Sequence, residues 1–383
     1  MRRVKRRGLL TKGGPARAYR AGRRAALRLK RSPAGSARPP DARLLNDAWC
    51  DFRGERRHGL RPLRQYLAAM NAFLRGVAAQ AKTGKPDVVL MPTRKTVGAV
   101  VTVMNEAATL AGVLAQLARL ALTETVVIVN GSRDESFSVA RNAGVTVVHY
   151  PEPLGHDVGR ALGAKLTETD IVLFLDGDIP IRAEQLLPFI DAVHRGTDVA
   201  LNNLTPFLGP MRHWDDVTLM KAFLNHCLDR ADLAANSLTA VPHALSRRAI
   251  REIGPRDLMV PPCALVKAVL RGLVVRAPAS VNVIAANRRR RLNTGRENPV
   301  SDLIVGDHLE AIHLLKQLRG PRLGFADGIR NRKAAEMPDA SPGAVTDGAA
   351  VLAAAPSTMP DASLAAVPSL MPAPPSDAAA GGG

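Results

Sequence analysis

The chain has 383 residues, a formal net charge of +19, 46% apolar residues and only 3% aromatic residues. This apolar content is enough for a folded core and excludes a wholly disordered protein, and no apolar stretch approaches the roughly 18 residues that span a bilayer. The scarcity of aromatic residues argues against a stacking surface for single-stranded nucleic acid, so we do not expect nucleic acid as a partner.

Cysteine usage and the start of the chain indicate a compartment. Cys50, Cys227 and Cys263 are widely separated and lack the spacing of a metal site, which is typical of buried thiols in a reducing environment. The basic N-terminus is not followed by the apolar segment of a secretory signal. We therefore expect a cytoplasmic protein.

Both ends of the chain differ in composition from the middle. Residues 1–45, which begin MRRVKRRGLL, are predicted to form a basic disordered arm, and residues 331–383, rich in Ala and Pro, a disordered tail. Much of the excess positive charge lies in the arm. An anionic membrane surface would attract it, which would place the protein at the inner face of the membrane.

Residues 46–96 are predicted to form a helical extension. After Pro62, apolar residues recur at three- and four-residue steps, the spacing of one helix face. They are Leu63, Leu67, Met70, Leu74 and Val77. The stretch KTGKPD, which begins at Lys82, marks the boundary to a main domain over residues 97–330.

The first part of the main domain alternates strands and helices. Strands are predicted over 98–103, 125–129 and 145–150, with a helix after each of the first two. This alternation predicts a parallel sheet with right-handed crossovers. We expect Asn105 to be the N-cap of the first helix, and Ser132 with Glu135 has the spacing of a capping box for the second.

A glycine-rich stretch and an acidic strand end follow. The stretch LGHDVGRALGAK would let the backbone approach an anion at a helix N-terminus, where Arg160 could bind a phosphate; close packing of small residues is the alternative. The segment DIVLFLDGDIP ends a buried strand with Asp176 and Asp178. Their spacing lets both carboxylates face one hard cation, and an ordinary solvated turn is the alternative.

The segments VVTVMNEAATL, VVIVNGSRDES, LGHDVGRALGAK and DIVLFLDGDI, in this order, resemble the nucleotide-binding half of family-2-type glycosyltransferases of the GT-A fold. The resemblance covers about residues 97–330. It implies an α/β protein of GT-A type with a Rossmann-like, mostly parallel central sheet flanked by helices. Composition and periodicity add the helical N-terminal extension and the disordered tails. Residues 97–200 would bind a nucleoside diphosphate sugar, and residues 201–330 the acceptor.

The resemblance also implies a nucleoside pocket. Asn105 and Glu106 would line it, and Asp134 would lie beside it. At the end of the second strand the family commonly has an acid that holds the base, and this chain has Asn130. Because an amide both donates and accepts hydrogen bonds, base binding is expected to persist with altered preference.

The diphosphate and the metal would lie at the next strand end. By the same resemblance, Asp176 and Asp178 would hold Mn²⁺ or Mg²⁺ against the diphosphate, and His156 and Arg160 of the glycine-rich stretch would contact the donor. A hard cation held by carboxylates stabilises the charge that develops on a diphosphate leaving group.

The second half departs from the family at the proton acceptor. Inverting members usually carry a Glu-Asp pair before a helix that ends in glycine. Counted back from Gly272, that place holds residues 260–262, a valine and two prolines, none of which accepts a proton. The candidate bases are therefore Asp307, His308 and Asp257.

Two of the remaining features have structural alternatives. Asp307 and Glu310 have capping-box spacing before the helical segment IHLLKQL, so Asp307 could be part of a helix start. The run Arg288–Arg291 could close over the diphosphate or face anionic lipid.

The expected function is transfer of a sugar from a nucleoside diphosphate donor to an acceptor that is a glycan, a lipid carrier or a small molecule, with inversion and an unidentified base. One alternative is a retaining enzyme similar to the synthases that make glucosyl- or mannosylglycerate. Others are a nucleotidyltransferase, for which MNEAATLAG lacks the usual lysine-bearing glycine loop, and a non-catalytic basic adaptor.

Overall fold

The computed structural model describes residues 14–30, 41–54, 60, 62–284, 298–330 and 332. Residues 1–326 form one compact unit, and residues 327–383 form a second, of which 327–330 and 332 are described. The predicted C-terminal tail, apart from Arg332, and the Arg288–Arg291 run lie outside the described residues. No helix in the described ranges is long and apolar enough to cross a membrane.

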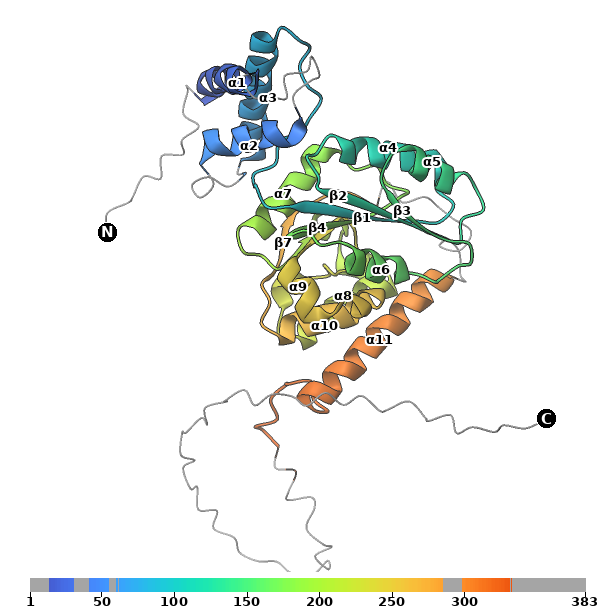
Figure 1. Cartoon of the computed structure of the whole chain (residues 1–383). Coiled ribbons are helices and arrows are strands. Elements are labelled where there is room, and N and C mark those ends of the chain that lie inside the picture. The colour runs from blue at the N-terminus through green and yellow to red at the C-terminus, as the bar shows by residue number, and fades with distance from the viewer. Residues whose placement is uncertain are drawn as a thin grey trace, which may run out of the picture. The chain divides into compact units, whose positions relative to one another are not determined.

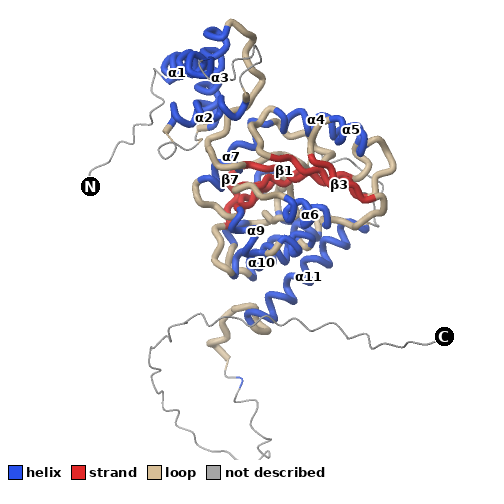
Figure 2. Tube along the Cα trace, viewed as in Figure 1, coloured by secondary structure: helices blue, strands red, loops and turns tan. Residues whose placement is uncertain are grey.

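The described residues contain one seven-stranded sheet with helices on both faces (Figures 1 and 2). Its order is β3-β2-β1-β4-β6-β5-β7, and only β6 runs antiparallel to its neighbours among these strands. The strands are β1 Val97–Val103, β2 Glu124–Asn130, β3 Thr146–Tyr150, β4 Ile171–Asp176, β5 Val199–Asn202, β6 His243–Ser246 and β7 Val275–Ala279. The predicted mostly parallel α/β sheet is confirmed.

Strand β1 is buried on both faces because helices cover both sides of the sheet. Its residues Val97, Ala99, Val101 and Val103 belong to one apolar core, and Val100 belongs to the other. Alternate side chains of a strand point to opposite faces, so an unbroken apolar run is what a central strand requires. The parallel register pairs Thr102 with Asp176, which brings the carboxyl ends of β1 and β4 together.

The two helical layers divide as Figure 1 shows, with α4, α5 and α7 over one face and α6 and α8 to α10 over the other. Helix α11 packs against α8 and α10. The helices are α4 Ala107–Ala118, α5 Ser136–Asn142, α6 Val158–Leu166, α7 Ala183–His194, α8 Asp216–Cys227, α9 Arg247–Ile253, α10 Pro261–Leu270 and α11 Pro299–Arg319. Short 3₁₀ turns cover Thr205–Phe207, Met211–His213, Ala231–Leu233 and Pro255–Met259. All three cysteines are buried.

The helical extension begins earlier than the sequence predicts. It consists of α1 Gly14–Lys30, α2 Ala42–Arg53 and α3 Leu63–Ala81. The prediction of a disordered arm over 1–45 was therefore wrong for the residues of α1 and for the start of α2, while residues 1–13 and 31–40 lie outside the described residues. The composition suggested disorder because α1 packs through Ala and Gly residues, which add little hydrophobicity to the sequence.

Two glycines explain how α1 packs so closely. A Cβ added to Gly22 would lie 2.0 Å from the Phe73 carbonyl oxygen, and one added to Gly76 would lie 2.0 Å from the Tyr19 carbonyl oxygen. The backbones of α1 and α3 thus touch where they cross. Close approach of this kind gains dispersion energy over many atom pairs, which compensates for the small side chains.

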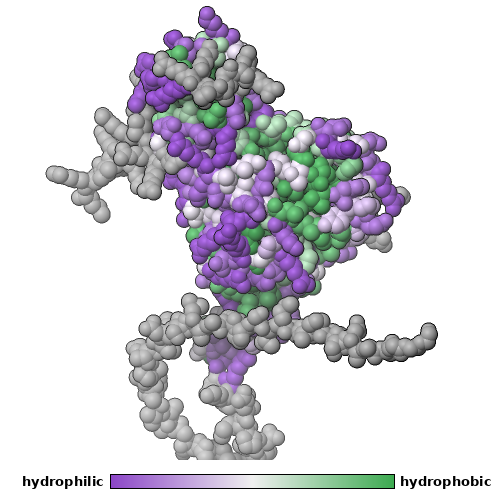
Figure 3. Space-filling model, viewed as in Figure 1, coloured by the Kyte–Doolittle hydropathy of each residue, from purple (hydrophilic) through white to green (hydrophobic). Residues whose placement is uncertain are grey.

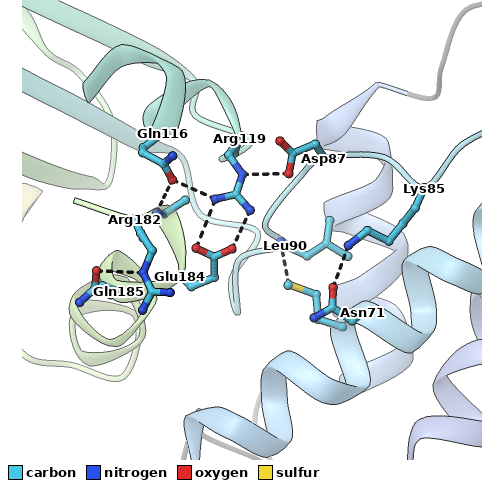
Figure 4. A network of polar contacts seen from close by, with 11 residues as sticks. Asn71, Lys85, Asp87, Leu90, Gln116, Arg119, Arg182, Glu184 and Gln185 are labelled. Carbon is cyan, nitrogen blue, oxygen red and sulfur yellow. Dashed lines mark hydrogen bonds and ion pairs between the residues drawn. The ribbon is translucent and has the colours of Figure 1, made fainter. Parts of the chain in front are cut away.

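A polar network attaches the extension to the sheet domain (Figure 4). Arg119, at the end of α4, donates to Glu184 of α7 at 2.6 Å and to Asp87 of the connecting segment at 3.0 Å. The Val89 amide donates to the Arg119 carbonyl at 2.7 Å, and the Leu90 amide contacts Met70 Sδ of α3 at 3.2 Å. The connecting segment is therefore bound on both sides.

We expect Gly76→Ala to destabilise the extension, because its new methyl group would meet the α1 backbone. Overpacking of this kind costs about 1–3 kcal/mol. Thermal melting and hydrogen exchange of the α1 amides measure the effect. The matched control is Gly306→Ala in α11, where nothing lies within 4 Å of the added Cβ and the helix gains about 1 kcal/mol in propensity. Equal α1 protection in both variants would contradict the close crossing.

Candidate functional site

The site is built on the turn that follows β4. The Gly177 amide donates to the Thr102 carbonyl at 2.9 Å, which fastens the turn to β1. A Cβ at position 177 would lie 2.5 Å from Glu106 Oε2. A larger residue at position 177 would have to displace the buried Glu106 carboxylate and would crowd Val103 Cγ2 at 2.9 Å, so glycine leaves Glu106 in place.

Asp176 is fixed by two neighbours and stays accessible. Its Oδ1 accepts a hydrogen bond from Thr102 Oγ1 at 2.9 Å and lies 3.6 Å from Arg160 Nη2. The Asp176 side chain keeps 32% of its exposure. A carboxylate held in one orientation and reachable from solvent is suited to bind a cation. Asp178 follows in the turn, partly buried, with its Oδ1 inside the protein.

Arg160 is the buried centre of the site. Its Nε lies 3.1 Å from Asp157 Oδ1, its Nη2 faces Asp176, and its Nη1 donates to the Leu238 carbonyl at 3.1 Å. All three guanidinium nitrogens have protein partners, and the side chain is only 5% exposed. In this structure the Arg160 side chain therefore neutralises and positions carboxylates, and its contact with a donor phosphate stays a prediction.

Asp157 is a site residue that sequence reasoning missed. It stands at the N-cap position of α6 with φ +60°, in the left-handed region, and is almost fully buried. Burial raises its pKa, while the charges of Arg160 and His156 lower it. His156 Nε2 lies 3.7 Å from Asp157 Oδ2 and is 44% exposed, so His156 reaches the surface beside this pair.

Asn130 holds the glycine-rich loop. Its Nδ2 donates to the Gly155 carbonyl at 2.9 Å, and its Oδ1 accepts from the Leu154 amide at 2.6 Å. Both ends of the amide are therefore engaged by the loop that leads into α6. A carboxylate at this position could not donate a hydrogen bond to the Gly155 carbonyl. The contact with the loop therefore explains why this chain has an amide at position 130.

Asn105 does not cap α4 as predicted. It has φ +58°, its amide donates to Ser132 Oγ at 3.1 Å, and its Oδ1 accepts from the Arg133 amide at 2.8 Å. The start of α4 is capped from the neighbouring loop, where Asp134 Oδ2 accepts from the Ala107 amide at 2.9 Å. A cap supplied from a distant part of the chain leaves no spacing signal in the sequence.

The predicted capping box of Ser132 and Glu135 was also wrong. Helix α5 begins at Ser136, Glu135 makes no side-chain cap, and the Ser136 amide donates to Asp134 Oδ1 at 3.0 Å. Asp134 thus caps two helices at once. Although partial burial opposes its ionisation, the hydrogen bonds from Ser136 and Ala107 lower the pKa of Asp134.

Helix α11 brings Asp307 to the site. Burial, together with the charges of Asp157 and Glu310, raises the pKa of Asp307 to about 6, and His156 opposes the shift. The capping-box alternative for Asp307 was wrong, because α11 starts at Pro299 and its cap is Asn298, which accepts from the Ser301 amide at 3.0 Å. Asp307 is therefore a helix-interior acid beside the buried ion pairs.

His308 and Asp257 are less available to accept a proton. His308 is fully buried, its Nδ1 contacts the Ile304 carbonyl at 2.6 Å, and burial lowers its pKa to about 4. It is neutral at pH 7 but closed to solvent. Asp257 pairs with Lys267 Nζ at 2.6 Å. Residues 260–262 lie at the start of α10 and supply no acid.

Two further basic residues approach the site without a sequence signal. Burial lowers the pKa of Lys221 in α8 to about 8. The positive charge of Arg160 acts in the same direction, and the negative charges of Asp215 and Asp157 oppose the shift. His243 in β6 stacks on Phe174 at 5.0 Å between ring centroids, and burial lowers its pKa to about 3. Their places depend on helix and strand packing, which no spacing in the sequence encodes.

The described residues contain no group of three or more His, Cys, Asp or Glu side chains arranged to hold a metal ion. A divalent cation at Asp176 and Asp178 would therefore need most of its ligands from a bound diphosphate and water. Mg²⁺ commonly binds in this way, through one or two carboxylates and substrate phosphates. The donor set fits such an ion.

Residues 99–252 match the family model described as Glycosyl transferase family 2. The resemblance inferred from the four motifs is thereby confirmed for this part of the chain. The match and the sheet order together confirm the predicted GT-A-type fold. The matched residues include most of β1, all of β2 to β6 and the Asp176–Asp178 turn.

Among solved structures, the chain is similar to glucosyl-3-phosphoglycerate synthase from Mycobacterium tuberculosis. The complex of that protein with Mn²⁺, uridine diphosphate and glucosyl-3-phosphoglycerate has 19% identity and a TM-score of 0.43, over 61% of this chain and 81% of that one. Its complex with Mg²⁺ and uridine diphosphate has 18% identity and a TM-score of 0.42, over the same shares. No curated protein matches the sequence significantly.

We expect Arg160→Met to lower the free energy of unfolding by about 3–5 kcal/mol, because Asp157 would remain buried without its ion pair. Urea unfolding at neutral pH measures the loss, and adding Asp157→Asn should restore part of it. The control Arg271→Met removes an exposed pair with Glu252 and should cost at most about 1 kcal/mol. Equal losses in Arg160→Met and Arg271→Met would contradict the central role of Arg160.

Proposed function

We propose that the protein transfers a glycosyl group from a nucleoside diphosphate sugar to an acceptor hydroxyl. The observation that carries the proposal is the accessible Asp176, fixed by Thr102 and Arg160 at the carboxyl edge of the sheet, within residues that match a glycosyltransferase family. In open α/β sheets, ligands bind at this edge, where loops from several strands meet.

The donor would lie across the ends of β1, β2 and β4. Asn105, Glu106 and Asp134 belong to two loops joined by hydrogen bonds, and these loops would form the wall of the nucleoside pocket. Asn130 would act on the pocket through the loop that it holds. The diphosphate would lie over Asp176 and Asp178.

Asp176 and Asp178 would hold Mg²⁺ or Mn²⁺. When bound, the cation would supply Lewis-acid stabilisation of the diphosphate leaving group. Thr102 and Arg160 orient Asp176 for this role, and Arg160 also limits the local negative charge of Asp157 and Asp176 before a ligand binds.

We infer that Asp307 would be the base, which its raised pKa and its electrostatic interactions with Asp157 and His156 support. Its carboxylate would take the proton of the acceptor hydroxyl as the acceptor oxygen bonds to the anomeric carbon and the bond from that carbon to the diphosphate breaks. A carboxyl with a pKa of about 6 is ionised at neutral pH and is more basic than an ordinary aspartate. Direct displacement of this kind inverts the anomeric configuration.

Retention is the alternative, since residues 260–262 supply no acid at the place where inverting members carry one. A retaining transfer would not require Asp307 as base. The anomeric configuration of the product, read by NMR from a donor of known configuration, separates the two outcomes. The acceptor remains a hydroxyl of a glycan, a lipid carrier or a small molecule.

We expect Asp178→Ala and Asp176→Asn to abolish Mn²⁺-dependent donor binding while the fold persists, because the cation would lose a carboxylate ligand. Titration calorimetry with UDP, GDP and TDP, with and without Mn²⁺, measures the binding. Asp216→Asn, an exposed acid at the start of α8, is the control with the same charge change. Failure of the wild type to bind any of these nucleotides would refute the proposed donor.

We expect Asp307→Asn to lower kcat by about 10²–10⁴-fold, the usual contribution of a general base. The wild-type rate should rise as the pH passes through about 6, because the ionised form accepts the proton. Glu310→Gln should move that midpoint to lower pH, since Glu310 raises the pKa of Asp307. A pH profile that Glu310→Gln does not shift would argue against Asp307.

The raised pKa of Asp307 also predicts that the Asp307→Asn variant is more stable than the wild type at neutral pH. Asp307 titrates near its ordinary 3.8 when unfolded and at about 6 when folded, so its ionisation costs stability as the pH rises between these values. The free energy of unfolding of Asp307→Asn should therefore equal that of the wild type below about pH 4. Above pH 6 it should exceed the wild-type value by about 1 kcal/mol, after allowance for partial solvent screening. Denaturant unfolding across this pH range measures the gap.

A further inference from the structure

Helix α1 has two sharply different faces. At 100° per residue, Arg17, Arg20, Arg24 and Arg28 fall within a stripe of about 80°, and all four are exposed. The adjoining face, which reaches round to the far side of the helix, is buried and consists of small residues, Ala18, Ala21, Gly22, Ala25 and Ala26. We call the four arginines the arginine stripe.

Packing fixes the direction in which the arginine stripe points. The buried face of α1 is in backbone contact with α3 at Gly22 and Gly76, so α1 cannot turn about its axis without a clash. Arg23, outside the stripe, donates to Gln80 of α3 at 3.0 Å and adds to this hold. The stripe is therefore presented outward by a rigid helix, and the described surface around α1 is mostly hydrophilic (Figure 3).

The arginine stripe has no close polar partner within the described part of the chain. None of its four side chains forms an ion pair or hydrogen bond with another described residue. The acids across the groove between α1 and α2 are Asp47 and Asp51, and Asp51 pairs with Arg94. The first 40 residues contain fourteen Lys and Arg and no Asp or Glu.

Two leucines beside the arginine stripe indicate the kind of partner. Leu27 of α1 is 47% exposed, and Leu44, which lines the groove with Arg24 and Arg28, is 46% exposed. Helices that lie on membranes combine Lys or Arg with such apolar residues, because the cations meet headgroups and the leucines enter the interface. Phosphate contacts of a nucleic acid would leave both leucines in water, and Tyr19, the one aromatic residue of α1, is partly buried against the core.

We propose that α1 docks the protein onto a bilayer of anionic lipids through the arginine stripe. The attraction is electrostatic, with a small apolar contribution from Leu27 and Leu44. Each arginine near an anionic surface contributes about a fivefold gain in partitioning, and the effect falls within a Debye length of about 10 Å at 0.1 M salt. Binding is therefore reversible and sensitive to salt.

Co-sedimentation of the full chain with lipid vesicles tests the proposal. The wild type should bind vesicles of phosphatidylcholine with phosphatidylglycerol, should not bind phosphatidylcholine alone, and should dissociate as salt is raised. Replacing all four stripe arginines by Gln should reduce binding by well over tenfold at low salt. Replacing them by Lys, which keeps the charge, should preserve it.

The matched control removes four positive charges elsewhere. Arg251, Arg256, Lys316 and Arg319 are exposed on α9, the 3₁₀ turn that follows it, and α11, and their replacement by Gln should leave binding near the wild-type level. Circular dichroism confirms that each variant is folded. The proposal would be overturned if the stripe variant and the control variant lost vesicle binding equally. It would also be overturned if the wild type bound neutral and anionic vesicles equally. Tighter binding of the stripe to RNA or DNA than to anionic vesicles at the same salt would also overturn it.

Discussion

The site depends on one buried cation, the guanidinium of Arg160. It lies between two carboxylates, at 3.1 Å from Asp157 and 3.6 Å from Asp176, in surroundings that exclude most water. Removing water from charges is costly, and only close pairing compensates for it. Arg160 therefore makes it possible to keep two acids side by side at the end of a parallel strand, and the parallel register of β1 and β4 adds Thr102 as a second support for Asp176.

The loops around Arg160 are held by hydrogen bonds to neighbouring loops and helices. Asp134 caps both α4 and α5, and Asn130 joins the end of β2 to the loop before α6. Loops tied in this way need little rearrangement when a ligand binds, and preorganised groups stabilise developing charge most effectively. On α11, burial and then the charges of Asp157 and Glu310 raise the pKa of Asp307.

The N-terminal helices are organised by a different constraint, backbone contact between two glycines. Gly22 and Gly76 let α1 lie directly on α3, and the contact leaves the arginine stripe on the exposed side of α1. The connecting segment is held to the sheet domain by Arg119 through Asp87, and to α3 by the contact of the Leu90 amide with Met70. A cationic surface and a proposed catalytic edge thus belong to one compact unit.

The sequence by itself determined the alternation of strands and helices, the buried β1 and β4, and the acids at the end of β4, because apolar periodicity and chain order are local properties. It also identified Asp307 as a candidate acid. Only the tertiary structure decided that Arg160 pairs with acids, that Asp134 rather than Asn105 caps α4, that Asp157 and Lys221 approach the site, and that α1 is a packed helix. These depend on contacts between residues far apart in the chain, and on backbone approach at glycine, which composition and spacing do not record.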